Sequence, residues 1–250
     1  MKLAQLKTRT LIATLGMAML GQLALAQTAI PDYIKKAVAS PERVAAMTDR
    51  DSLRFPAETL ALSGIKPGDS VVEITGFGQY YTTLLSAVVG ANGKVAVFDL
   101  PYTEARAGQP SRDFVSKHPN TTYTVVDYNE IKLPSNVDIV FNVLYYHDLM
   151  LNNIDVAKMN KKIFDALKPG GVYFIVDHNA KPGSGTTDTK AMHRIDPEVI
   201  KKEITAAGFK LEADSKLLAN KDDDHSWPVS FAPGKRGTTD QSTLKFVKPK

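Results

Sequence analysis

No cysteine occurs among the 250 residues of the chain. Disulfide bonds, thiolate zinc sites and a lipid-carrying cysteine are therefore excluded. Internal repeats and low-complexity tracts are also missing, and the 43% of hydrophobic and 23% of charged residues exclude a disordered or collagen-like chain. The composition is that of a globular protein able to bury one core, and we expect a single domain of about 200 residues.

The chain also has no apolar run long enough to cross a bilayer, which needs about 20 residues. Its longest run, Leu11 to Leu25, is shorter than that. Basic residues precede this run and small residues end it: Lys2, Lys7, Arg9 and Ala24-Leu25-Ala26. This pattern predicts a signal peptide over residues 1–26, and hence a periplasmic protein that leaves the membrane after cleavage.

A strong basic excess is missing from the mature chain as well. The predicted signal peptide carries three basic and no acidic residues, so cleavage lowers the formal net charge from +4 to about +1. A nucleic-acid partner therefore has no electrostatic support. We expect a small-molecule partner, and the sequence leaves the oligomeric state open.

The mature chain divides into a helical preface over residues 27–68 and an α/β part over residues 69–250. In the preface, Ser40-Pro41-Glu42 is typical of an N-cap and first helical turn, and a second helix is expected from Pro56 to about Leu62. Gly64 and the residues after it are turn formers, which are expected to end the helical preface before an apolar run begins.

From residue 69 onward, short β-branched runs alternate with helical stretches, which predicts a parallel sheet with right-handed crossovers. Helices are expected to begin near Tyr80, to run from Val156 to Leu167, and to follow an Asp196 N-cap. The expected strands are Val71–Thr75, Lys94–Phe98, Thr122–Val126, Val137–Val143, Val172–Val176, Phe209–Leu218 and Ser242–Val247.

Polar residues and glycines follow the predicted strands, where parallel sheets bind their ligands. Glu73 lies within the first strand, and Gly76 and Gly78 follow it at the entry to a helix. Asp99 follows the second strand and Asp127 the third. The segment from Asn142 to Asp148 follows the fourth.

This order resembles that of the class I S-adenosylmethionine-dependent methyltransferases, particularly an exported bacterial branch of predicted methyltransferases. The resemblance implies a Rossmann-like α/β fold with a mostly parallel seven-stranded sheet and a C-terminal antiparallel strand. It also implies an enzyme that transfers a methyl group to a small-molecule acceptor. The matching segments span nearly the whole mature chain: Tyr146-His147-Asp148-Leu149, Leu167-Lys168-Pro169-Gly170-Gly171, Asp177-His178, His193-Arg194-Ile195-Asp196 and Gly237-Thr238-Thr239-Asp240.

The resemblance assigns site residues for the cofactor S-adenosyl-L-methionine. Glu73, Gly76 and Gly78 would line its methionine part, Asp99 its ribose and Asp127 its adenine edge. The segment from Asn142 onward would border the methyl group in transfer, with candidate catalytic residues Tyr146, His147 and Asp148.

The glycine loop departs from the family pattern, because Thr75, Phe77 and Gln79 occupy its three glycine positions. Either Gly76 and Gly78 supply the unusual φ angles, or Phe77 fills space that the cofactor needs. The alternative function is therefore an exported, non-catalytic small-ligand-binding protein on a degenerate methyltransferase fold.

Histidines in predicted loops offer a different alternative, a metal-assisted hydrolase or oxidoreductase. Three of the four have an acidic neighbour, and imidazole with carboxylate can hold zinc or iron. None has the helical spacing of an established metal motif, so no metal site is assigned. The four are His147, His178, His193 and His225.

Overall fold

The computed structural model describes residues 29–229 and 234–250. The predicted signal peptide, residues 1–26, lies outside the described residues. The helices are α1 (Asp32–Val38), α2 (Ala45–Thr48), α3 (Asp51–Arg54), α4 (Pro56–Ser63), α5 (Tyr80–Val89), α6 (Pro101–Lys117), α7 (Tyr146–Leu149), the 3₁₀ turn η1 (Met150–Asn152), α8 (Val156–Ala166), α9 (Thr189–Met192) and α10 (Pro197–Ala206).

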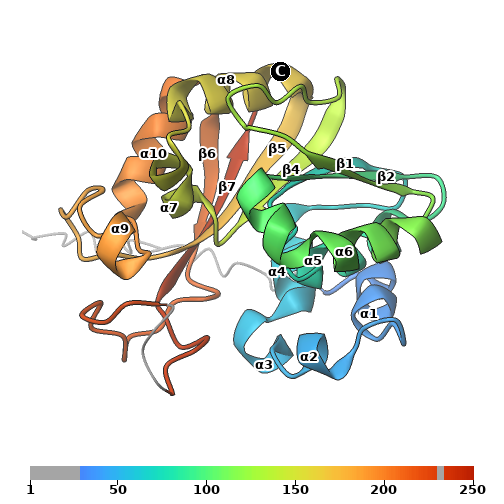
Figure 1. Cartoon of the computed structure of the whole chain (residues 1–250), viewed down its shortest axis with the longest axis horizontal. Coiled ribbons are helices and arrows are strands. Elements are labelled where there is room, and N and C mark those ends of the chain that lie inside the picture. The colour runs from blue at the N-terminus through green and yellow to red at the C-terminus, as the bar shows by residue number, and fades with distance from the viewer. Residues whose placement is uncertain (1–28, 230–233) are drawn as a thin grey trace, which may run out of the picture.

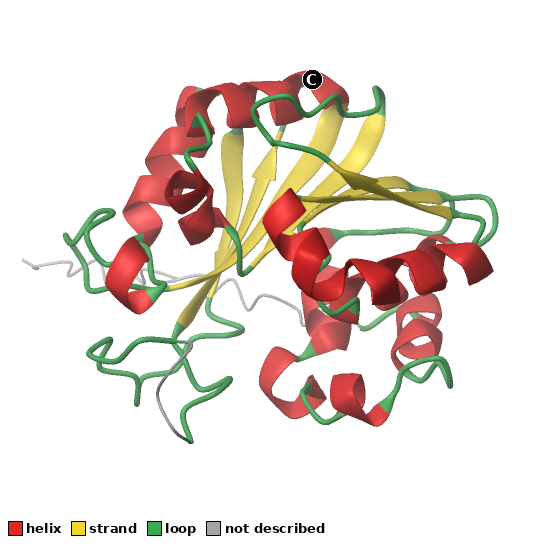
Figure 2. Ribbon diagram, viewed as in Figure 1, coloured by secondary structure: helices red, strands yellow, loops and turns green. Residues whose placement is uncertain are grey.

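One seven-stranded sheet forms the centre of the molecule (Figures 1 and 2). Its order is β3-β2-β1-β4-β5-β7-β6, and β7 runs antiparallel to both of its neighbours while the other pairs are parallel. The predicted fold class is confirmed. The strands are β1 (Ser70–Ile74), β2 (Lys94–Asp99), β3 (Thr121–Val125), β4 (Val137–Val143), β5 (Leu167–His178), β6 (Lys210–Ser215) and β7 (Gln241–Val247).

Apolar side chains cover both faces of the sheet, because successive strand residues point to opposite sides. Val72 and Val140 pack on one face with apolar residues of α8 and α10, whereas Val71 and Phe141 pack on the other with those of α1, α4 and α5. These two layers fix the positions of all the strand ends.

The strand order reverses between β1 and β4, which are adjacent in the sheet although β2 and β3 lie between them in the chain. In such sheets the ligand site lies beyond the carboxyl ends of the two central strands. Helices α2 and α3 and the long loop before β7 lie on this side of the molecule (Figure 1). Among the described residues, no helix is long and apolar enough to span a membrane.

Most predicted elements are present, with their ends shifted by a few residues, but two predictions are wrong. Ser40-Pro41-Glu42 forms a turn in which the Ser40 hydroxyl accepts the Glu42 amide (3.3 Å), and α2 begins only at Ala45. Strand β5 begins at Leu167, so the predicted helix-stopping segment that follows already belongs to the strand. The Asp196 N-cap is confirmed, because its side chain accepts the Glu198 amide.

Candidate functional site

Two connected hollows of about 580 and 690 Å³ lie beyond the carboxyl ends of β1, β4 and β5. The smaller is lined by residues of the β1 loop and of α7, and the larger lies between α3 and the loop before β7. Six residues line both hollows: Arg50, Arg54, Leu144, His178, Val229 and Arg236.

The β1 loop keeps a glycine-like backbone without glycine at two of its positions. Thr75 has φ 64° and Gln79 φ 50°, in the left-handed region that side chains disfavour, and Gly78 has φ 78°. The Thr75 hydroxyl lies 2.6 Å from that of Tyr128, and the Gln79 amide donates to Ser111 at 2.9 Å. Side-chain bonds therefore accompany the strained conformation at both positions.

Gly76 serves a different purpose from the one expected, since its φ is not positive. A Cβ atom at this position would meet Val97 Cγ1 at 2.6 Å and Thr82 Oγ1 at 3.0 Å. Its amide donates to Asp99 at 3.0 Å. Gly76 lets the loop lie against β2, so the expectation that it supplies an unusual φ is wrong.

Phe77 does not fill the hollow. The residue is 55% exposed and lies at the edge of the smaller hollow, which it helps to line. The space beside the β1 loop is therefore open, as cofactor binding requires.

Glu73 lies at the base of this space and is almost fully buried. The Thr82 hydroxyl donates to its carboxylate at 2.6 Å. Burial raises the pKa of Glu73 to about 8, and the nearby Asp99 carboxylate acts in the same direction. At neutral pH the side chain is therefore mostly protonated and can donate a hydrogen bond.

Of the six predicted cofactor residues, only Glu73 lines a hollow, and the other five, Gly76, Gly78, Asp99, Asp127 and Asn142, lie outside the walls of both. Asp99 is fully buried and accepts bonds from the Gly76 amide and the Tyr123 hydroxyl (3.0 Å each), so it anchors the loop. Asp127 is exposed and caps a turn by accepting the Asn129 amide at 2.8 Å. Asn142 is enclosed beneath the site, and its amide lies 3.4 Å from the Tyr173 hydroxyl.

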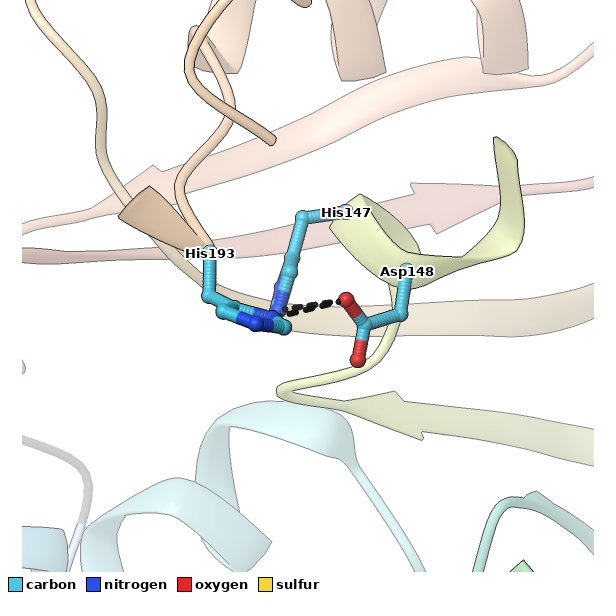
Figure 3. Close-up of side chains that lie close together, drawn as sticks. All are labelled: His147, Asp148 and His193. Atoms are coloured by element: carbon cyan, nitrogen blue, oxygen red, sulfur yellow. Dashed lines mark hydrogen bonds and ion pairs between the residues drawn. The ribbon is translucent and has the colours of Figure 1, made fainter. Parts of the chain in front are cut away.

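A polar wall formed by His147, Asp148 and His193 faces the smaller hollow (Figure 3). Asp148 Oδ1 lies 3.3 Å from His147 Nε2 and 3.0 Å from His193 Nδ1. On its other side, His147 Nδ1 lies 2.6 Å from Asp177 Oδ1. The polar wall brings together residues 45 positions apart in the chain.

The charges around the polar wall set its protonation. Burial lowers the pKa of His147, but the Asp177 and Asp148 carboxylates outweigh that effect and the net pKa is raised. Burial and the charge of His147 lower the pKa of the neighbouring His178 to about 3. The pKa values of these two neighbouring imidazoles are therefore shifted in opposite directions.

Tyr145 and Tyr146, which precede His147 in the chain, have different surroundings. Tyr145 lines the smaller hollow. Tyr146 is fully buried, where its hydroxyl donates to Glu203 at 2.9 Å and accepts from Asn160 at 2.8 Å. Tyr146 lines neither hollow, so its placement gives no support to the predicted catalytic role.

The sequence analysis missed the arginines of the preface. Arg50 and Arg54 line both hollows, with their guanidinium carbons 4.9 and 4.6 Å from the centre of the Tyr80 ring. Arg43 is bonded to Asp51 at 2.5 Å, and Asp51 also accepts the Tyr80 hydroxyl at 2.6 Å. The spacing of Arg50 and Arg54, four positions apart, was the available signal.

The loop before β7 is attached by a buried ion pair. Arg194 donates to Asp223 at 2.8 and 3.1 Å, and both side chains are fully enclosed. Asp223 also accepts the Asp240 amide at 2.6 Å. The loop places Val229 and Arg236 in the walls of the hollows.

The fold is that of the class I S-adenosylmethionine-dependent methyltransferases. A SAM-dependent methyltransferase from Aquifex aeolicus matches with a TM-score of 0.59 and 18% identity, covering 87% of this chain and 97% of that chain. The (4+2)-cyclase SpnF matches with a TM-score of 0.55 and 14% identity, covering 82% and 81%. At these identities the likeness concerns the fold alone.

Sequence relatives are similar over part of the chain. The ubiquinone/menaquinone biosynthesis C-methyltransferase UbiE of Pseudoalteromonas translucida is 24% identical over 191 residues, 76% of this chain and 68% of its own length. UbiE of Hydrogenovibrio crunogenus is 25% identical over 118 residues, 47% of this chain and 45% of its own length. The chain thus spans about half to two thirds of these relatives. No family model matches it.

Proposed function

We propose that this protein is an S-adenosylmethionine-dependent methyltransferase that acts on a small-molecule acceptor. The observation that carries the proposal is the β1 loop, which holds the glycine-type conformation beside an open hollow although glycine is missing at positions 75 and 79. The similarity to UbiE methyltransferases, together with the fold, supports the same chemistry.

The residues present fit the cofactor in part. Glu73, Thr75 and Phe77 line the smaller hollow and would border the methionine part of the cofactor. Arg50 and Arg54 would hold the carboxylate of the methionine part, because the Nε of Arg50 is buried without a hydrogen-bond partner among the described residues. Asp99 holds the loop, so ribose recognition falls to other groups of the hollow.

The cofactor, when bound, supplies an electrophilic methyl group on a sulfonium. Bound beside Glu73 and Thr75, it would give this methyl group to a lone pair of the acceptor, and its sulfur would be left as a thioether. The hollow holds the acceptor in line, and the polar wall of His147, Asp148 and His193 receives the proton that the acceptor loses.

Isothermal titration of the mature protein with S-adenosylmethionine and with S-adenosylhomocysteine tests this proposal. Binding of both at one site per chain is expected. The matched variant is Arg54→Gln, which removes one charge from the wall and should weaken both ligands by about tenfold, the usual scale for losing one charge-assisted hydrogen bond. Absence of heat with either ligand contradicts the proposal.

The alternative, a non-catalytic binding protein, is favoured by the strained residues at positions 75 and 79. It predicts binding without turnover. Incubation with methyl-labelled S-adenosylmethionine and a small-molecule extract separates the two, since only a methyltransferase produces a labelled acceptor.

The proposal includes export to the periplasm, supported by the pattern of residues 1–26. N-terminal sequencing of the protein from a periplasmic fraction tests it. A mature end at Gln27 is expected, and an intact Met1 in the cytoplasmic fraction contradicts it.

A further inference from the structure

The polar wall of His147, Asp148 and His193 has the composition of a metal centre. It presents two imidazoles and one carboxylate, and one ligand atom from each residue lies within 4.8 Å of the others. Two imidazoles with a carboxylate suit borderline divalent metals such as zinc or iron better than magnesium or calcium, which prefer oxygen.

The separations between these ligand atoms agree with a shared ion. Zinc binds nitrogen and oxygen at about 2.1 Å, so neighbouring ligands on a tetrahedral or octahedral ion lie about 3.0–3.4 Å apart. In the polar wall, Asp148 Oδ1 lies 3.3 Å from His147 Nε2 and 3.0 Å from His193 Nδ1 (Figure 3). The ligand nitrogens of His147 and His193 form the third pair and lie within 4.8 Å of each other.

The contact of Asp177 with His147 also supports a metal site. Asp177 lies 2.6 Å from His147 Nδ1 and also accepts the His147 amide at 2.8 Å. A carboxylate on one ring nitrogen orients the other nitrogen as a ligand, the arrangement found behind many metal-bound histidines. Asp177 is fully buried, so it holds the ring rigidly.

The polar wall is also open on one side. Asp148 and His193 keep 23% and 29% of their side-chain surface exposed, and all three residues line the smaller hollow. Three protein ligands leave coordination positions free for water or a ligand atom, as in catalytic rather than structural sites.

We propose that His147, Asp148 and His193 bind a divalent transition-metal cation whose open positions face the hollow, with Asp177 as the positioning residue. The site goes beyond the proposed methyltransferase function and does not depend on it. If both hold, the cation takes over the part of the three side chains as proton acceptor: an acceptor oxygen bound to it loses its proton to solvent in the hollow more readily, because the positive charge stabilises the anion.

Cobalt titration of untagged, chelator-treated protein tests the site, since bound Co²⁺ absorbs visible light. One equivalent per chain is expected, displaced by Zn²⁺. His193→Ala should weaken binding at least tenfold, and Asp177→Asn about 10–100-fold. His225→Ala is the matched control, because His225 pairs with Asp240 at 3.1 Å outside the polar wall and should leave binding unchanged.

Folding of each variant is checked by circular dichroism, and Asp148→Asn gives a second, more conservative test of the same ligand set. Failure of wild-type protein to bind Co²⁺ or Zn²⁺ stoichiometrically overturns the proposal. Equal binding by wild type, His193→Ala and Asp148→Asn also overturns it. The cobalt titration contains no S-adenosylmethionine, so a negative result does not bear on the methyltransferase proposal. That proposal is tested separately by the titration with S-adenosylmethionine.

Discussion

The Thr75 hydroxyl donates to the Tyr128 hydroxyl at 2.6 Å, because the single hydroxyl proton of Tyr128 is directed to the Phe98 carbonyl at 2.8 Å. This bond joins the β1 loop to the segment that follows β3. It holds Thr75 in a backbone conformation that costs a non-glycine residue about 1–2 kcal/mol. The loop thus holds this shape although residues 75 and 79 are not glycine.

Restoring glycine at positions 75 and 79 should therefore change cofactor affinity little. The double variant Thr75→Gly, Gln79→Gly removes strain and two side-chain hydrogen bonds together, and these effects offset each other. A change of 1.4 kcal/mol in binding free energy alters Kd tenfold, and the net change expected here is smaller. We therefore expect the Kd for S-adenosylhomocysteine to stay within about threefold of wild type. A gain above tenfold would show that the side chains obstruct the ligand, as in the degenerate-fold alternative.

Gly76→Ala should destabilise the protein by about 1–3 kcal/mol, since the new Cβ meets Val97 Cγ1 at 2.6 Å. Chemical denaturation measures the effect. Val97→Ala removes the clashing atom, so the double variant should be more stable than the sum of the two single changes predicts. Simple additivity would mean that the loop does not rest on β2 through this contact.

Stability should fall as the pH rises through the range in which Glu73 ionises. The pKa of Glu73 is about 8 in the folded protein and about 4.3 in the unfolded chain, so between these values the folded state binds more protons. Ionisation of Glu73 lowers the free energy of unfolding by up to about 1.4 kcal/mol per pH unit, and this effect levels off above pH 8. Urea unfolding across this range measures it.

Glu73→Gln should flatten that dependence, because glutamine does not titrate. The exposed Glu130→Gln is the matched control and should keep the wild-type slope. Identical slopes in wild type and Glu73→Gln would mean that Glu73 is ionised in the fold.

Asp223→Asn should destabilise the protein by about 3 kcal/mol, because it leaves the enclosed Arg194 without its charge partner. The loop before β7 should become more sensitive to limited proteolysis. The neighbouring exposed Asp222→Asn is the control and should behave as wild type. Equal proteolysis of the two variants would show that the ion pair does not hold the loop.

Sequence periodicity was sufficient to locate the strands, because runs such as Val137–Val143 are buried on both faces and bounded by turns, whereas the antiparallel strand was expected only from the family resemblance. It also located the β1 loop and the segment containing His147 and Asp148. Both follow directly from strand ends, whose position in a parallel sheet is fixed by topology.

The remainder of the site depends on contacts between distant segments. His193 meets Asp148 across 45 residues, and Arg194 meets Asp223 across 29. The direction of a side chain is equally hidden, since Tyr146 points into the core while its neighbour Tyr145 lines the hollow. The tripeptide Asp222-Asp223-Asp224 has a composition typical of a solvated loop, yet Asp223 is buried, because its partner Arg194 lies 29 residues away in the chain.

A crystal structure of the mature protein with S-adenosylhomocysteine tests the central claim most directly. We expect the ligand in the hollow bounded by Glu73, Thr75 and Tyr145, with Phe77 still at the edge of that hollow. Ligand bound elsewhere at saturating concentration, or a Phe77 ring turned into that hollow, would contradict it.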